Sequence, residues 1–154
     1  MEGFRDYKLD TKGTPAEISL YTGQKVSRGE GQFRVQYWME APEDPSQRQF
    51  PWRCRITVPG GGLQATTEEF AFTAPEKGYS EAVEVVSESR PEAWSRKMDQ
   101  SYYVRLPDGN YGRVKFNLVG SQNPFFGVEA FINPSGSRNL EYDGAVQPKP
   151  AFYE

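Results

Sequence analysis

One stretch in the first third of the chain decides the fold, and it reads Gly31-Gln32-Phe33-Arg34-Val35-Gln36-Tyr37-Trp38-Met39. Apolar side chains fall at the odd positions from 33 to 39, while polar side chains and Trp38 fall between them. A period of two is the pattern of a β-strand with one buried face. We therefore expect a strand whose odd positions face a hydrophobic core and whose even positions face outward.

Similar segments recur along the chain, separated by turn-forming residues. We expect further strands at 52–58, 69–73, 82–86, 102–106, 111–118 and 125–132. Segment 41–49 contains two prolines, which lack amide donors, so it predicts a loop. Asp108-Gly109 favours the positive φ of a tight hairpin turn. These signals describe short strands joined mostly by turns.

Length and composition fit one all-β domain. A chain of 154 residues has the usual size of a single domain. Aromatic residues make up 14% of the chain, and 15 Gly and 12 Pro punctuate it, which favours strands and turns. We expect a single antiparallel β-sandwich over 1–154, immunoglobulin-like or jelly-roll in wiring. We also expect at most one short helix, at 92–100, and a loosely held tail at 144–154.

Charge and hydropathy argue against several classes of partner. The net charge of −3 disfavours nucleic-acid binding, which needs clustered excess cations. No apolar run approaches the ~20 residues that span a bilayer. The start of the chain, residues 1–6, lacks the apolar core of a signal peptide. This leaves either a cytoplasmic protein or one whose removed leader has been replaced by Met1.

The residue inventory argues against an enzyme. The chain has no histidine, which removes the commonest general base, metal ligand and catalytic-triad member. Cys54 is in phase with the apolar positions of its strand, so we expect it in the core as a small hydrophobe. No spacing singles out a glycosidase pair, and cross-strand ion pairs are the simpler interpretation of the acids. The acids considered are Glu68, Glu69, Glu84, Glu88 and Glu129.

Oxygen ligands near turns make calcium the one metal with candidate ligands. They are Asp108, Asn110 and Asp143. The chain lacks the Asp-x-Asp-x-Asp-Gly loop of a dedicated calcium site. We therefore expect no cofactor, with calcium as the open alternative.

The even positions of the first strand predict an outward face suited to sugars. The same parity turns side chains of segments 52–58 and 111–118 outward. If these strands share one sheet, the face combines an exposed Trp with cations and amides, which stack on sugar rings and bind hydroxyls and carboxylates. The predicted ligand-binding residues are Trp38, Arg34, Gln36, Arg53, Arg55, Arg113, Lys115 and Asn117. Alternatively, the cations pair with Glu40, Glu69, Glu84 and Glu129 across strands, and Trp38 is covered.

A second aromatic set lies near the turns. Its members are Trp94, Tyr79, Phe125 and Tyr142. Aromatic side chains in such places grip ligands or partners. They also act as hydrophobic plugs that close the open ends of a sandwich, which is the interpretation we favour.

Three stretches together carry a resemblance: Val58–Leu63 with Glu69–Phe72, the hairpin Tyr102–Arg113, and Asn133–Glu141. They resemble secreted or cell-surface β-sandwich domains of planctomycete- and verrucomicrobial-type bacteria, some described as carboxypeptidase-regulatory-like. The resemblance covers the last two-thirds of the chain, and the Gly-rich opening strand of those domains is not found before Glu30. It implies an extracytoplasmic accessory module and transfers no active site.

These observations lead to two expectations. The first is a non-catalytic surface or secreted module that binds carbohydrate, acidic polysaccharide included. The second is a structural or assembly domain that packs against neighbouring subunits of a larger extracellular protein, which would bury Trp38 and the arginines.

Overall fold

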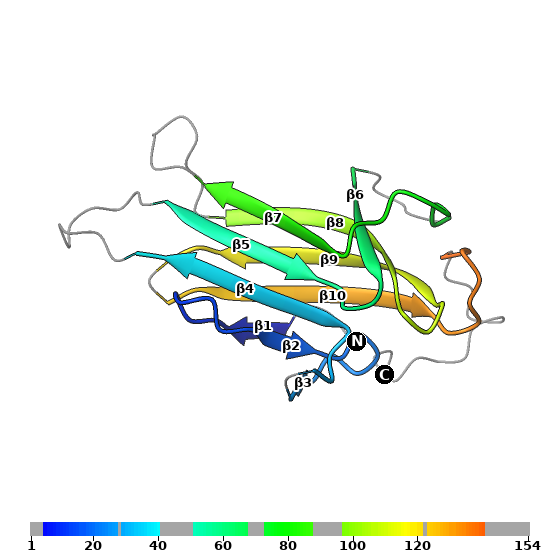
Figure 1. The fold of residues 1–154 in the computed structure, drawn as a ribbon, viewed down its shortest axis with the longest axis horizontal. Coiled ribbons are helices and arrows are strands. Elements are labelled where there is room, and N and C mark those ends of the chain that lie inside the picture. The colour runs from blue at the N-terminus through cyan, green and yellow to red at the C-terminus, as the bar shows by residue number, and fades with distance from the viewer. Residues whose placement is uncertain are drawn as a thin grey trace.

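The computed structural model describes residues 5–27, 29–40, 51–67, 73–87, 97–121 and 123–140, and within them it contains strands and no helix. The strands are β1 Arg5–Lys8, β2 Ala16–Ile18, β3 Lys25–Val26, β4 Phe33–Met39, β5 Trp52–Thr57, β6 Gly62–Thr66, β7 Ala82–Ser87, β8 Lys97–Arg105, β9 Tyr111–Val119 and β10 Phe125–Asn133. They form two antiparallel five-stranded sheets (Figure 1). The predicted all-β sandwich is confirmed.

One sheet, here called the β9 sheet, has the strand order β1-β10-β9-β8-β6. The other, here called the β4 sheet, has the order β3-β2-β4-β5-β7. Consecutive strands β8, β9 and β10 are neighbours, as are β4 and β5, while β6 and β7 lie in different sheets. The connectivity therefore combines hairpins between adjacent antiparallel strands with connections that cross from one sheet to the other.

The core lies between the two sheets and is rich in aromatic rings. Phe33, Val35 and Tyr37 have no exposed surface, which confirms the predicted parity of β4. The ring of Phe33 lies 6.0 Å from that of Phe116 on β9, measured between centroids. Phe116 in turn lies 5.7 Å from Phe126 on β10. Burying each such side chain contributes ~1.5–3 kcal/mol to folding.

The helix predicted at 92–100 is wrong for residues 97–100, which form the start of β8. The reason is that this part of the chain already belongs to the hairpin, since Met98 pairs with Leu118 of β9. Three other predictions fall outside the described residues: the rest of that helix at 92–96, most of the strand at 69–73, and the tail at 144–154. Thr73 itself forms an isolated bridge with Asn139.

Part of the outer face of the β9 sheet is covered by chain segments 73–80 and 138–140. Tyr103 and Phe131 point outward by strand parity, yet they are only 3% and 4% exposed. Arg113 explains how the cover is attached: its Nη1 donates to the carbonyl oxygen of Leu140 at 2.6 Å. Its guanidinium also lies 5.1 Å from the ring centroid of Phe131. Leu140 is fully buried under this arrangement.

Candidate functional site

The structure divides the predicted ligand-binding residues between opposite sides of the sandwich. Those of β4 and β5 lie on the outer face of the β4 sheet, and those of β9 lie on the outer face of the β9 sheet. The first set is Arg34, Gln36, Trp38, Arg53 and Arg55, and the second is Arg113, Lys115 and Asn117. A ligand on one face cannot reach the other, so the candidate site is the first set alone.

The residues of this candidate site form a compact grid on two adjacent strands. Trp38 pairs with Arg53, and Gln36 pairs with Arg55. Directly opposite partners on one face of an antiparallel pair have Cβ atoms ~4.5–5.5 Å apart. Glu84 on the next strand, β7, lies opposite Arg55 and adds an acid to the edge of the grid.

The indole of Trp38 is half-buried between two neighbours. On the β2 side lies Gly13, whose amide donates to the Tyr37 carbonyl at 2.9 Å. A Cβ placed on Gly13 would lie 2.0 Å from the indole Nε1, so the ring packs directly against this glycine. On the β5 side, the guanidinium carbon of Arg53 lies 4.3 Å from the ring centroid. A ligand would therefore meet a guanidinium–indole stack rather than a bare ring.

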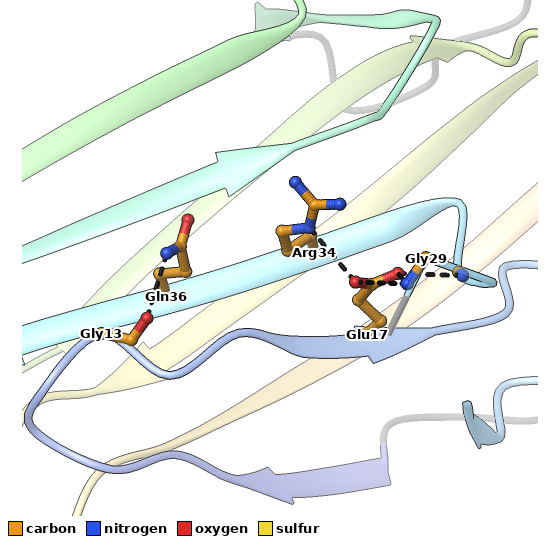
Figure 2. A network of polar contacts seen from close by, with 6 residues as sticks. Gly13, Glu17, Gly29, Arg34 and Gln36 are labelled. Atoms are coloured by element: carbon orange, nitrogen blue, oxygen red, sulfur yellow. Dashed lines mark hydrogen bonds and ion pairs between the residues drawn. The ribbon is translucent and has the colours of Figure 1, made fainter. Parts of the chain in front are cut away.

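Glu17 on β2 is a buried carboxylate that fixes the edge of the site (Figure 2). It accepts hydrogen bonds from the amides of Gly29 and Gly31 at 3.0 Å and from Arg34 Nε at 3.3 Å. Burial alone would raise the pKa of Glu17, but the two amides and the Arg34 charge outweigh it and lower the pKa below 4.5. The carboxylate therefore stays charged and holds Arg34 in place.

The remaining polar groups of the face differ in how they are held. Gln36 Nε2 donates to the Gly13 carbonyl at 3.0 Å. Arg53 Nε lies 3.5 Å from a carboxylate oxygen of Glu84, and both side chains are about half exposed, at 49% and 47%. Arg55 is exposed and has no hydrogen bond or ion pair within the described residues. It is thus the arginine of this face most available to a ligand.

The predicted alternative, in which the cations pair with acids across strands, is realised for part of the face. Glu84 pairs with Arg53 as expected, whereas Arg34 pairs with Glu17, which the sequence did not single out. Glu17 lies in a strand of three residues, too short to show a period, so no sequence signal marked it. Three arginines, two glutamates and Lys12, which pairs with Trp38, leave this face two positive charges.

The two described members of the second aromatic set, Tyr79 and Phe125, lie apart. Tyr79 packs 6.1 Å from Tyr111, centroid to centroid, and its hydroxyl donates to the Pro75 carbonyl at 2.9 Å. Tyr111 pairs with Asn133 at the end of β10, whereas Phe125 lies at the start of that strand. Trp94 and Tyr142 lie outside the described residues. Tyr79 therefore packs from the covering segment 73–80 onto Tyr111 of the β9 sheet, apart from Phe125.

Two of the turn residues considered for calcium, Asp108 and Asn110, form hydrogen bonds within the protein. Asp108 accepts hydrogen bonds from the Tyr21 hydroxyl at 2.5 Å and from the Asn110 amide at 2.9 Å. Burial and the neighbouring Asp108 carboxylate raise the pKa of Tyr21 to about 12, so its hydroxyl remains a donor. These bonds tie the β8–β9 hairpin to the loop after β2. Asp143 lies outside the described residues.

Of the acids considered for a glycosidase pair, the two that the structure describes lie apart. Glu84 lies on the β4 sheet and Glu129 on the β9 sheet. Glu68, Glu69 and Glu88 lie outside the described residues. Among the residues that are described, no cluster of three or more His, Cys, Asp or Glu side chains is suited to hold a metal ion.

In the parts that the structure describes, no helix has the length and apolar character needed to cross a membrane. Comparisons with models of protein families, with curated proteins and with solved structures gave no match. A function must therefore be argued from the geometry of the face around Trp38.

Proposed function

We propose that this protein is a non-catalytic carbohydrate-binding module whose ligand lies on the outer face of the β4 sheet. The observation that carries the proposal is the stack of Trp38 and Arg53 beside Gln36 and Arg55. It puts an aromatic ring, planar cations and an amide side by side on two strands. Sugars offer the matching groups, namely C–H groups that pack against the guanidinium–indole stack and hydroxyls for the donors.

The rigidity of this face supports the proposal. Gly13 holds the indole from one side, and the Glu17 carboxylate holds Arg34 from another. Side chains already fixed in the free protein lose less conformational entropy when a ligand binds. This smaller loss of entropy matters for a polysaccharide, because each of its contacts contributes little to the binding free energy.

We further propose that the module works outside the cytoplasm, on the cell surface or in a secreted protein. The resemblance to bacterial surface β-sandwich domains, described above, supports this location. It also fits a module without catalytic residues, which would serve as an accessory to other domains.

The test is a screen of polysaccharides by glycan array and affinity electrophoresis. We expect retarded migration in at least one polysaccharide and a loss of affinity of about tenfold or more in Trp38→Ala, since the ring and its stacked guanidinium are lost together. The matched control is Phe125→Ala, which removes a half-buried aromatic ring from the opposite sheet. Absence of binding to every polysaccharide, or equal binding by Trp38→Ala, would overturn the proposal.

One observation favours the assembly domain as a second candidate. Val86 is 62% exposed on β7, which is the last strand in the order of the β4 sheet. Edge strands with exposed apolar side chains invite pairing with another chain. This candidate predicts self-association that Val86→Lys abolishes, measured by size-exclusion chromatography with light scattering. A strict monomer at all concentrations would contradict assembly of this chain with itself.

A further inference from the structure

Arg34 offers two guanidinium nitrogens to a ligand. Its Nε is engaged by Glu17 at 3.3 Å, and in Figure 2 both Nη atoms point away from that carboxylate. The side chain is 30% exposed. Because Glu17 is itself fixed by the amides of Gly29 and Gly31, the guanidinium is held in one orientation. A guanidinium fixed in this way is suited to donate two parallel hydrogen bonds to a planar anion.

Gln36 offers a fixed acceptor two residues further along β4. A carbonyl oxygen can accept but not donate, so the atom that faces the Gly13 carbonyl at 3.0 Å is Nε2. The amide oxygen therefore faces the other way, away from Gly13, as Figure 2 shows. No hydrogen bond to this oxygen is formed by the described residues. This oxygen can accept a hydrogen bond from a ligand hydroxyl.

Arg55 completes the arrangement from the neighbouring strand. It lies directly opposite Gln36, while Arg34 lies opposite Thr57, so the two arginines are diagonal neighbours on one face. Diagonal neighbours are ~7–8 Å apart, within reach of long side chains. The two guanidinium groups can therefore converge on one small group beside the Gln36 oxygen.

Two guanidinium donors beside one acceptor complement a carboxylate with a hydroxyl next to it. We infer that the ligand of this face contains uronic acid units, whose carboxylate is bound by Arg34 and Arg55 and whose neighbouring hydroxyl donates to Gln36 Oε1. The inference rests on the proposed function and names the class of polysaccharide. A neutral sugar would leave the Arg55 charge without a counterpart.

The charge of the face favours a carboxylated polymer over a densely sulfated one. Glu17 and Glu84 share the face with the three arginines and with Lys12, which pairs with Trp38, so these residues carry an excess of two positive charges. The carboxylates of two neighbouring uronate units balance this excess, whereas closely spaced sulfates would meet repulsion from the exposed Glu84. Selectivity for one acid group on each sugar unit follows from this balance.

The test compares uronate polymers with their neutral counterparts. Polygalacturonate, alginate and a glucuronan are each used before and after chemical reduction of their carboxyl groups, with binding measured by affinity electrophoresis and calorimetry. We expect the wild-type protein to bind at least one acidic polymer on the order of tenfold more tightly than its reduced form. Arg55→Gln should lose that difference while keeping its affinity for the reduced form.

The control is Lys115→Gln, which removes one exposed cation from the opposite sheet and should leave both affinities unchanged. Equal binding of acidic and reduced polymers that is still lost in Trp38→Ala would overturn this inference and leave the proposed function standing. Tighter binding of dextran sulfate than of any uronate polymer would also overturn it. Binding of neither form, together with a blank glycan array, would overturn both.

Discussion

Glu17 is buried yet charged, so its effect on stability depends on the groups that donate hydrogen bonds to its carboxylate. Replacing it with Gln removes the charge and turns one acceptor oxygen into a donor that faces the amides of Gly29 and Gly31. We expect Glu17→Gln to lower the free energy of unfolding by about 1–3 kcal/mol, because the buried side chain loses its charge and the two glycine amides lose an acceptor. Urea denaturation at pH 7 measures this loss. An unchanged midpoint would contradict the role given to the carboxylate.

The same residue predicts a pH dependence of stability. Its pKa in the folded state is lowered from 4.5, so the folded protein binds the proton less readily than the unfolded chain. The contribution of Glu17 is therefore complete above pH 4.5 and is lost as the pH falls through the lowered folded pKa. Glu17→Gln should lose less stability than the wild type over this acidic range. Parallel curves for the two proteins would count against this linkage.

Gly13 is the second residue on which the proposed site depends. Its φ is 83°, a region that side chains rarely adopt, and a Cβ there would also clash with the indole of Trp38. Gly109→Ala is a matched control, because its φ is 90° but no atom lies within 4 Å of the added Cβ. We expect Gly13→Ala to be less stable than Gly109→Ala by about 1 kcal/mol or more in thermal unfolding. Equal losses would show that the indole moves aside freely.

Among the elements, the hairpin of β8 and β9 is tied to a loop distant in sequence. The Tyr21 hydroxyl donates to Asp108 at 2.5 Å and accepts from Asn110 Nδ2 at 2.8 Å. We expect Tyr21→Phe and Asp108→Ala each to destabilise the protein, with a coupling energy of about 1 kcal/mol in a double-mutant cycle. Urea unfolding of the four proteins measures it. Strictly additive losses would mean that the hydrogen bond contributes nothing.

The longer strands could be predicted from sequence because each is long enough to show its period. Strand β4 is the clearest case, since its odd positions are buried as predicted. The strands that were missed, β1, β2, β3 and β6, have two to five residues each. Too few side chains lie on each face of such strands for an alternation to be visible. Their positions are determined by pairing with longer neighbours, β1 with β10 and β2 with β4.

The candidate site could be predicted only in part, for a similar reason. Alternation tells which side of a strand a residue faces, and it placed Arg34, Gln36 and Trp38 correctly on an outer face. It does not tell which strands share a sheet, so Arg113 was assigned to the same face although β9 belongs to the other sheet. Sheet membership depends on contacts between distant segments, which a single sequence does not display.

For the molecule as a whole, Cys54 reports on global opening. It is fully buried in the core on β5, and burial raises its pKa to about 12, so almost no reactive thiolate forms at pH 8. We expect a thiol reagent such as DTNB to label the native protein only as fast as the whole fold opens, and to label it at once in 8 M urea. Rapid labelling without denaturant would show that the core opens locally beside β5.

The first and last of the described strands lie side by side, because Lys8 pairs with Phe125, 117 positions later. A ribosome therefore releases β1 long before the strand that completes its pairing has been synthesised. Topologies dominated by such distant pairings fold in milliseconds to seconds, and chains emerge at ~5–20 residues per second. We expect the nascent protein to need chaperone protection until β10 has left the exit tunnel.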